Sequence, residues 1–169
     1  MDSPLPERVY DPRTRASGGT NADDINDILR TFPVSLRKET TSSLWHREDQ
    51  ILQQNPDLIV IHRSCFTDPS SLADAKLNDH LYTLAESKLF TFLAYIALGN
   101  SRTKFVIYSR TFGEDSARAQ WVLSLESRFP PLKDRITALQ INGGDNATFR
   151  NPASALQIKT AVERTLGLR

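Results

Sequence analysis

A histidine, an arginine, a serine and the chain's only cysteine directly follow an aliphatic run at residues 58–61. These polar residues are His62, Arg63, Ser64 and Cys65. Histidine titrates near neutral pH and acts as a general base, which can activate a neighbouring serine or cysteine as a nucleophile. Side chains alternate between faces along a strand, so His62 and Ser64 are expected on one side and Cys65 on the other. Ser64 has none of the flanking glycines of a nucleophile elbow, so a buried structural cysteine and a histidine bonded to loop backbone are the alternative.

Further reactive side chains follow other predicted strands. The carboxyl ends of parallel strands meet at one edge of a sheet, where ligands of this fold class bind. The candidate catalytic residues at this edge are Asp11, His62, Ser64 and Ser109. Arginines, hydroxyl groups and glycine N–H groups suit a phosphate or carboxylate ligand. The candidate ligand-binding residues are Arg13, Arg15, Gly18, Gly19, Thr20, Arg63 and Arg110.

The glycine-containing loop at residues 17–21 is a weak anion-binding motif. Its sequence, Ser-Gly-Gly-Thr-Asn, matches neither a Walker loop nor a GxGxxG fingerprint. Asp23 and Asp24 follow at the start of a predicted helix and would repel a phosphate docked there. An ordinary loop before a capped helix is therefore the alternative to a small anionic ligand.

Charge and residue usage exclude several other functions. The formal net charge is +1, and no basic run with interleaved aromatic residues supports nucleic-acid binding. His46, His62 and His80 fall on different predicted elements without metal-ligand spacing, so neither a metal nor another cofactor is expected. No apolar run is long enough to span a membrane, and the start of the chain does not resemble a secretion signal. The single cysteine favours a reducing compartment, and we expect a cytoplasmic protein.

Hydrophobic patterning predicts the elements that position these residues. Strands are expected at residues 8–10, 34–38, 58–62, 104–108 and 135–141. Helices are expected at residues 21–32, 43–54, 81–98, 116–129 and 152–166. This alternation predicts a three-layer, doubly wound α/β fold with a mostly parallel sheet of four to five strands. A flavodoxin-like arrangement with strand order 2-1-3-4-5 is our first choice.

The first strand is the weak point of this prediction. In a flavodoxin-like sheet it would be central, yet residues 8–10 (Arg-Val-Tyr) are poorly suited to a buried strand. The strand is either very short or absent, or the chain is a fragment whose real first strand lies upstream. We expect residues 1–7 to be a disordered lead-in and residues 8–169 to form a single domain.

The predicted helix at residues 81–98 is apolar almost all round. Its inward face uses one set of apolar residues, which leaves Phe90, Ala94 and Leu98 in need of another partner. That partner is either the long polar segment at residues 67–79 or a second subunit. A symmetric homodimer is the expected form of self-association.

Two strands resemble those of receiver domains in two-component signalling. Residues 56–64 (PDLIVIHRS) resemble the third receiver strand, with His62 where a receiver carries its phospho-accepting aspartate. Residues 105–111 (FVIYSRT) resemble the fourth, with Ser109 at the position of its terminal serine or threonine. The acidic pair of the first strand is reduced to Asp11, and no lysine ends the last strand. The resemblance implies a degenerate receiver-like module that acts through protein contacts rather than through an aspartyl phosphate and magnesium.

The sequence thus leaves two functional hypotheses. We favour a non-catalytic receiver-like signalling or interaction domain that self-associates, or binds a partner protein, through the helix at residues 81–98. The alternative is a small hydrolase or transferase acting on a phosphorylated or nucleotide-like ligand at the carboxyl edge of the sheet. In that case arginines would bind the anion and His62 would act as the base.

Overall fold

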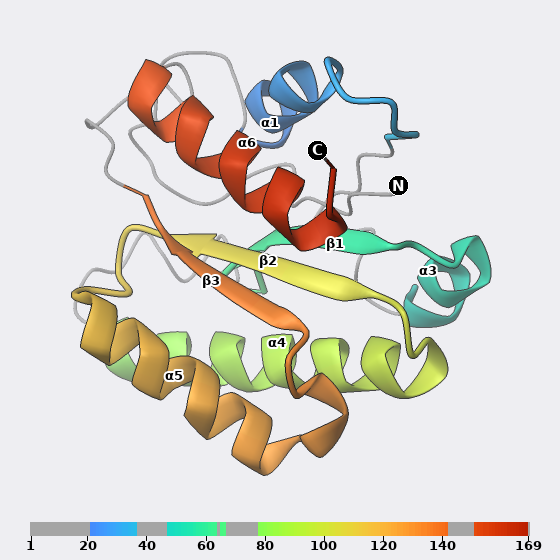
Figure 1. The fold of residues 1–169 in the computed structure, drawn as a ribbon. Coiled ribbons are helices and arrows are strands. Elements are labelled where there is room, and N and C mark those ends of the chain that lie inside the picture. The colour runs from blue at the N-terminus through green and yellow to red at the C-terminus, as the bar shows by residue number, and fades with distance from the viewer. Residues whose placement is uncertain (1–20, 37–46, 64, 67–77, 142–150, 169) are drawn as a thin grey trace.

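A parallel β-sheet organises the part of the chain that the structure describes. This structure, a computed structural model, describes residues 21–36, 47–63, 65–66, 78–141 and 151–168. Within these ranges the sheet has three strands in the order β1-β2-β3 (Figure 1). The strands are β1 (Leu58–His62), β2 (Lys104–Ser109) and β3 (Ile136–Gln140). The register pairs Val60 with Val106, and Val106 in turn with Thr137. The predicted α/β class and the parallel direction of these strands are confirmed.

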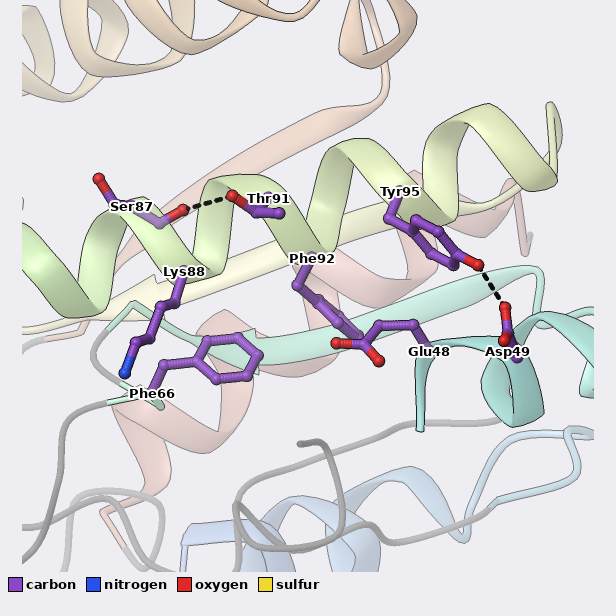
Figure 2. Close-up of a pocket in the computed structure, with 8 residues that line it drawn as sticks. All are labelled: Glu48, Asp49, Phe66, Ser87, Lys88, Thr91, Phe92 and Tyr95. Atoms are coloured by element: carbon purple, nitrogen blue, oxygen red, sulfur yellow. Dashed lines mark hydrogen bonds between the residues drawn. The ribbon is translucent and has the colours of Figure 1, made fainter. Parts of the chain in front are cut away.

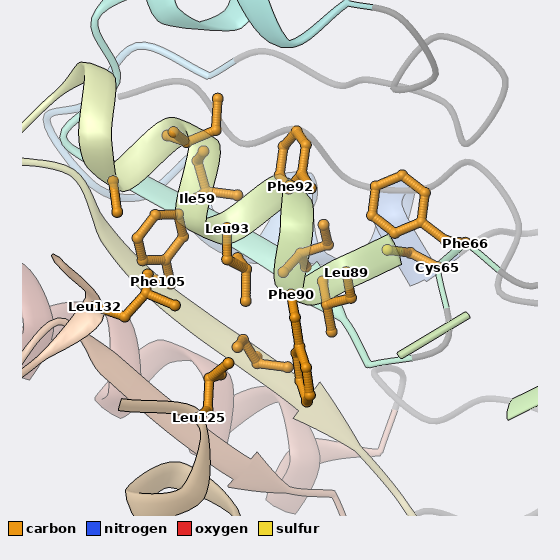
Figure 3. Close-up of a cluster of buried hydrophobic side chains, with 14 of the residues drawn as sticks. Ile59, Cys65, Phe66, Leu89, Phe90, Phe92, Leu93, Phe105, Leu125 and Leu132 are labelled. Carbon is orange, nitrogen blue, oxygen red and sulfur yellow. The ribbon is translucent and has the colours of Figure 1, made fainter. Parts of the chain in front are cut away.

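Helices cover both faces of the sheet. The helices of the described residues are α1 (Asn21–Leu29), α3 (Glu48–Gln54), α4 (Asn78–Gly99), α5 (Asp115–Arg128) and α6 (Pro152–Leu166), with a 3-10 turn, η3 (Pro130–Leu132). Figure 1 shows α1 and α6 on one face and α4 and α5 on the other. Each face has its own apolar cluster, and the cluster beneath α4 is drawn in Figure 3.

The aliphatic run of β1 is explained by this double cover. Leu58 and Val60 belong to the cluster beneath α1 and α6, whereas Ile59 and Ile61 belong to the cluster beneath α4. All four side chains are fully buried. A strand covered on both faces needs consecutive apolar residues, because successive side chains point to opposite sides. Burial of each such side chain contributes about 1.5–3 kcal/mol.

Several helix ends are determined by residues at or next to the end itself. The Asn151 side chain accepts a hydrogen bond from the Ala153 N–H at 2.9 Å, and Pro152 occupies the first helical position of α6. Gly167 ends α6 with a φ of 68°, in the left-handed region that glycine adopts without strain. α4 ends at Gly99, as the Gly-Asn pair predicts.

Arg135 ties the end of α4 to the sheet. Its guanidinium donates to the carbonyl oxygens of Thr103 at 2.7 Å, Ala97 at 2.9 Å and Pro131 at 3.0 Å, and also to that of Asn100. A cation suits a helix C-terminus, where the final carbonyls lack partners within the helix. Burial lowers the pKa of Arg135 from its ordinary value. The arginine therefore fixes α4 relative to β2 and β3.

Some predicted elements differ from the structure or lie outside it. Residues 34–36, predicted as the start of a strand, form bends and irregular backbone after α1. A turn closed by the Val34 N–H and the Phe32 carbonyl, 2.8 Å apart, interrupts the chain there. Leu36 packs against the apolar cluster, which explains the apolar pattern without a strand. α3 begins at Glu48, and the predicted start of this helix at Ser43 lies outside the described residues, as do residues 1–10.

Over the residues whose positions are described, none of the helices combines the length and the apolar character required to cross a bilayer.

Candidate functional site

The carboxyl edge of the sheet brings two of the predicted catalytic residues onto neighbouring strands. His62 ends β1 and pairs in register with Tyr108, and Ser109 ends β2. The His62 and Tyr108 rings make an edge-to-face contact with centroids 5.0 Å apart. The other two, Asp11 and Ser64, lie outside the described residues, as do Arg13, Arg15, Gly18, Gly19 and Thr20.

Ser109 is committed to the turn that follows β2. Only 1% of the residue is exposed. Its hydroxyl oxygen accepts a hydrogen bond from the Thr111 N–H at 3.1 Å and lies 2.8 Å from the Thr111 hydroxyl. The hydrogen-bond partners of the Ser109 hydroxyl thus lie within its own turn.

Arg63 is held by a cluster of side chains from α4 and α5. Its Nε and Nη2 donate to Glu86 Oε1 at 3.1 and 3.0 Å, and its Nη1 donates to the Thr111 carbonyl at 3.1 Å. Its guanidinium carbon lies 4.8 Å from the ring centroid of Phe112 and 5.3 Å from that of Trp121. The Trp121 indole N–H also donates to Glu86 Oε1. The guanidinium that was predicted to bind an anion is therefore already paired with a carboxylate.

Gln140 organises the loop between β2 and α5. Its Oε1 accepts from the N–H groups of Phe112 at 2.9 Å and Gly113 at 3.1 Å, and its Nε2 donates to the Arg110 carbonyl at 2.8 Å. Gly113 has a φ of 76°, which favours glycine. The backbone N–H groups of Phe112 and Gly113 therefore already donate to Gln140 and are not open to an anionic ligand. Sequence patterning gave no signal for Gln140, because it lies inside the strand predicted at residues 135–141.

Cys65 lies in the apolar cluster beneath α4. It is 2% exposed, and burial raises the pKa of its thiol well above the ordinary value. Because the thiolate is the reactive form, this environment suits packing rather than nucleophilic catalysis. The structural alternative for Cys65 therefore agrees with its position.

The three predicted interface residues of α4 have different surroundings. Phe90 is 9% exposed and packs against α5, with ring centroids 5.7 Å from Trp121 and 6.3 Å from Phe129. Ala94 is also buried, whereas Leu98 is 74% exposed. Helix α5 is thus an intrachain partner for Phe90, and it is neither of the two partners that the sequence suggested. Of the three residues, Leu98 remains available to another molecule.

A cavity that sequence reasoning missed lies between α3 and α4 (Figure 2). Its volume is about 500 Å³. Phe66, Phe92 and Tyr95 supply aromatic surface, and Glu48 and Asp49 line its α3 side. The Tyr95 hydroxyl donates to Asp49 Oδ1, and this bond raises the pKa of Tyr95. The signal in the sequence was Tyr95, which with Thr91 interrupts the apolar residues 89–98.

In the described ranges, no group of three or more His, Cys, Asp or Glu side chains could hold a metal ion. Comparison of the chain with models of known protein families and with curated proteins gave no match.

Proposed function

We propose that this protein is a non-catalytic, receiver-like interaction domain that binds a protein partner, in the first instance a second copy of itself, through the outer surface of α4. The observation that carries the proposal is the exposed apolar surface of this helix. Leu98 is 74% exposed and Tyr95 is 44% exposed, although most residues of α4 between Leu89 and Ala97 are buried. An exposed aliphatic side chain beside an aromatic one is typical of the centre of a docking surface.

The receiver-like part of the proposal is supported by the order and placement of the elements. The chain runs β1, α4, β2, α5, β3, α6, with α4 and α5 on one face of the sheet and α6 with α1 on the other (Figure 1). This arrangement is compatible with a flavodoxin-like sheet in which one further strand, predicted at residues 8–10, pairs with β1, whereas residues 34–36 supply none. His62 and Ser109 end neighbouring strands, as the receiver resemblance expects.

The non-catalytic part is supported by the carboxyl edge. Ser109, Arg63 and Gln140 are each engaged in hydrogen bonds within the chain. A hydrolase or transferase that used these side chains would first have to break those contacts. A signalling module of this kind, with its one cysteine buried, fits a cytoplasmic location.

Sedimentation velocity with three proteins tests the proposal. Phe90 is unsuitable for mutation, because a charge there would disrupt packing against α5. Leu98→Glu changes an exposed residue and is expected to leave the fold intact. Leu156→Glu is the matched control, because Leu156 is 63% exposed on α6, across the sheet from α4.

We expect the wild-type protein and Leu156→Glu to dimerise at low micromolar concentration, and Leu98→Glu to sediment as a monomer. A wild-type protein that remains monomeric at high micromolar concentration would refute self-association. Equal dimerisation of all three proteins would exclude α4 as the interface.

A further inference from the structure

The cavity between α3 and α4 has the size and lining of a small-molecule site. Its volume of about 500 Å³ lies within the roughly 300–1,000 Å³ typical of ligand pockets. Phe66 and Phe92 are 5% and 2% exposed, so both rings are anchored in the core. Their centroids lie 5.6 Å apart. Both line the cavity, and Tyr95, which is 44% exposed, supplies its accessible aromatic surface.

The polar groups on the α3 side of the cavity are acidic. Figure 2 shows the Glu48 side chain extending from α3 toward the Phe92 ring. Within the part of the chain that the structure describes, the Glu48 carboxylate has no hydrogen bond or ion pair. Asp49 accepts a hydrogen bond from the Tyr95 hydroxyl, which holds the phenol ring beside the cavity. One carboxylate is thus satisfied by Tyr95, and the other is available.

Lys88 is the one basic side chain among the described lining residues. Figure 2 places its ammonium group beside Phe66, at the opposite end from Glu48 and Asp49. A cationic ligand is therefore attracted to the α3 end of the cavity. The described lining carries two carboxylates and one ammonium group, so the cavity favours a cation over an anion.

We propose that this cavity binds a small organic cation, with an aromatic body against Tyr95 and the exposed parts of Phe66 and Phe92, and an ammonium group against Glu48. A cation beside a carboxylate makes a charge-assisted hydrogen bond, and aromatic faces add a favourable cation–π contribution. None of the described lining residues is among those that the sequence predicted to bind an anion. The cavity shares Tyr95 with the proposed self-association surface, and the two proposals have separate tests.

Isothermal titration calorimetry with three matched probes tests the proposal. Tryptamine carries the ammonium group, 3-ethylindole is its neutral counterpart, and indole-3-propionate carries a negative charge on a similar body. We expect tryptamine to bind most tightly and indole-3-propionate most weakly. Loss of one charge-assisted hydrogen bond should weaken tryptamine about tenfold in Glu48→Gln and leave 3-ethylindole unchanged.

Two further variants separate the site from general effects. Glu163→Gln makes the same charge change on α6, across the sheet from the cavity, and should bind tryptamine as the wild-type protein does. Thr91→Trp replaces an exposed residue at the cavity rim and should abolish binding of both indoles while circular dichroism remains unchanged.

Three outcomes would overturn the proposal. The first is no binding of tryptamine up to its solubility limit. The second is equal affinity for tryptamine and 3-ethylindole. The third is an equal effect of Glu48→Gln and Glu163→Gln. Sedimentation of the wild-type protein is read independently, so failure here leaves the interface experiment intact.

Discussion

The cluster formed by Arg63, Glu86 and Trp121 gives a quantitative test of whether the carboxyl edge has a structural role. Glu86 Oε1 accepts from Arg63 Nε, Arg63 Nη2 and the Trp121 indole. If these contacts stabilise the fold, replacement of either charged partner must lower the free energy of unfolding. If Arg63 instead serves a ligand, its removal costs little stability.

The expected magnitude follows from burial and charge. Hydrogen bonds to charged groups contribute roughly 1.5–3 kcal/mol when buried. The Arg63 and Glu86 side chains are 23% and 26% exposed, so water screens part of this contribution. Allowing for that screening, we expect Glu86→Ala to lower the free energy of unfolding by about 2 kcal/mol. With a denaturant slope of about 2 kcal/mol per molar urea, the midpoint falls by about 1 M.

A double-mutant cycle isolates the interaction itself. Urea unfolding followed by circular dichroism is measured for the wild-type protein, Glu86→Ala, Arg63→Met and the double variant. We expect a coupling free energy of about 1 kcal/mol, because the two side chains share direct hydrogen bonds. A coupling below about 0.3 kcal/mol, within the additivity of independent sites, would refute the structural assignment of this cluster.

Three further predictions concern other buried or paired groups. Arg135→Met should lower the free energy of unfolding by about 3 kcal/mol, because four carbonyl oxygens lose a charged donor. In the same urea experiment, Arg102→Met is the control, because Arg102 forms an exposed ion pair, and this change should lower the free energy of unfolding by less than about 1 kcal/mol. Cys65 should react with a thiol reagent much more slowly in the native protein than in urea, and equal rates would contradict its burial. The Asp49 hydrogen bond raises the pKa of Tyr95, so its contribution to stability is present below the ordinary tyrosine pKa of about 10 and is lost as the pH rises above it. In a near-ultraviolet titration, Asp49→Asn should shift one tyrosine to lower pKa, and an unchanged titration would contradict the contact.

Several elements could be predicted from the sequence because their causes are local. Residues 58–61 are aliphatic without alternation, which already requires cover on both faces of β1. Asn151, Pro152 and Gly167 specify the ends of α6 through caps that involve only neighbouring residues. Residues 34–36 were predicted wrongly as strand, because short apolar runs also occur where irregular backbone packs against a core.

Only the tertiary structure shows whether a predicted site residue is open to a ligand or partner or is already bonded within the chain. The sequence predicts that Arg63 binds an anion, but in the structure its guanidinium is paired with Glu86, 23 positions away. Gln140 accepts hydrogen bonds from two backbone N–H groups that lie 27 and 28 positions earlier in the chain. The sequence predicts that Phe90 is an interface residue, but in the structure α5 packs against it. Hydrophobic periodicity reports that a face is buried but carries no information about which element buries it.

Sequence alone thus determined the class of the fold and the edge of the sheet at which His62 and Ser109 end neighbouring strands. Strand direction and side-chain alternation follow from local pattern. Only the tertiary structure decided that Ser109, Arg63 and Cys65 have structural partners. It also revealed the cavity between α3 and α4. Such a cavity depends on how two helices approach across many intervening residues, and no local pattern encodes the space left between them.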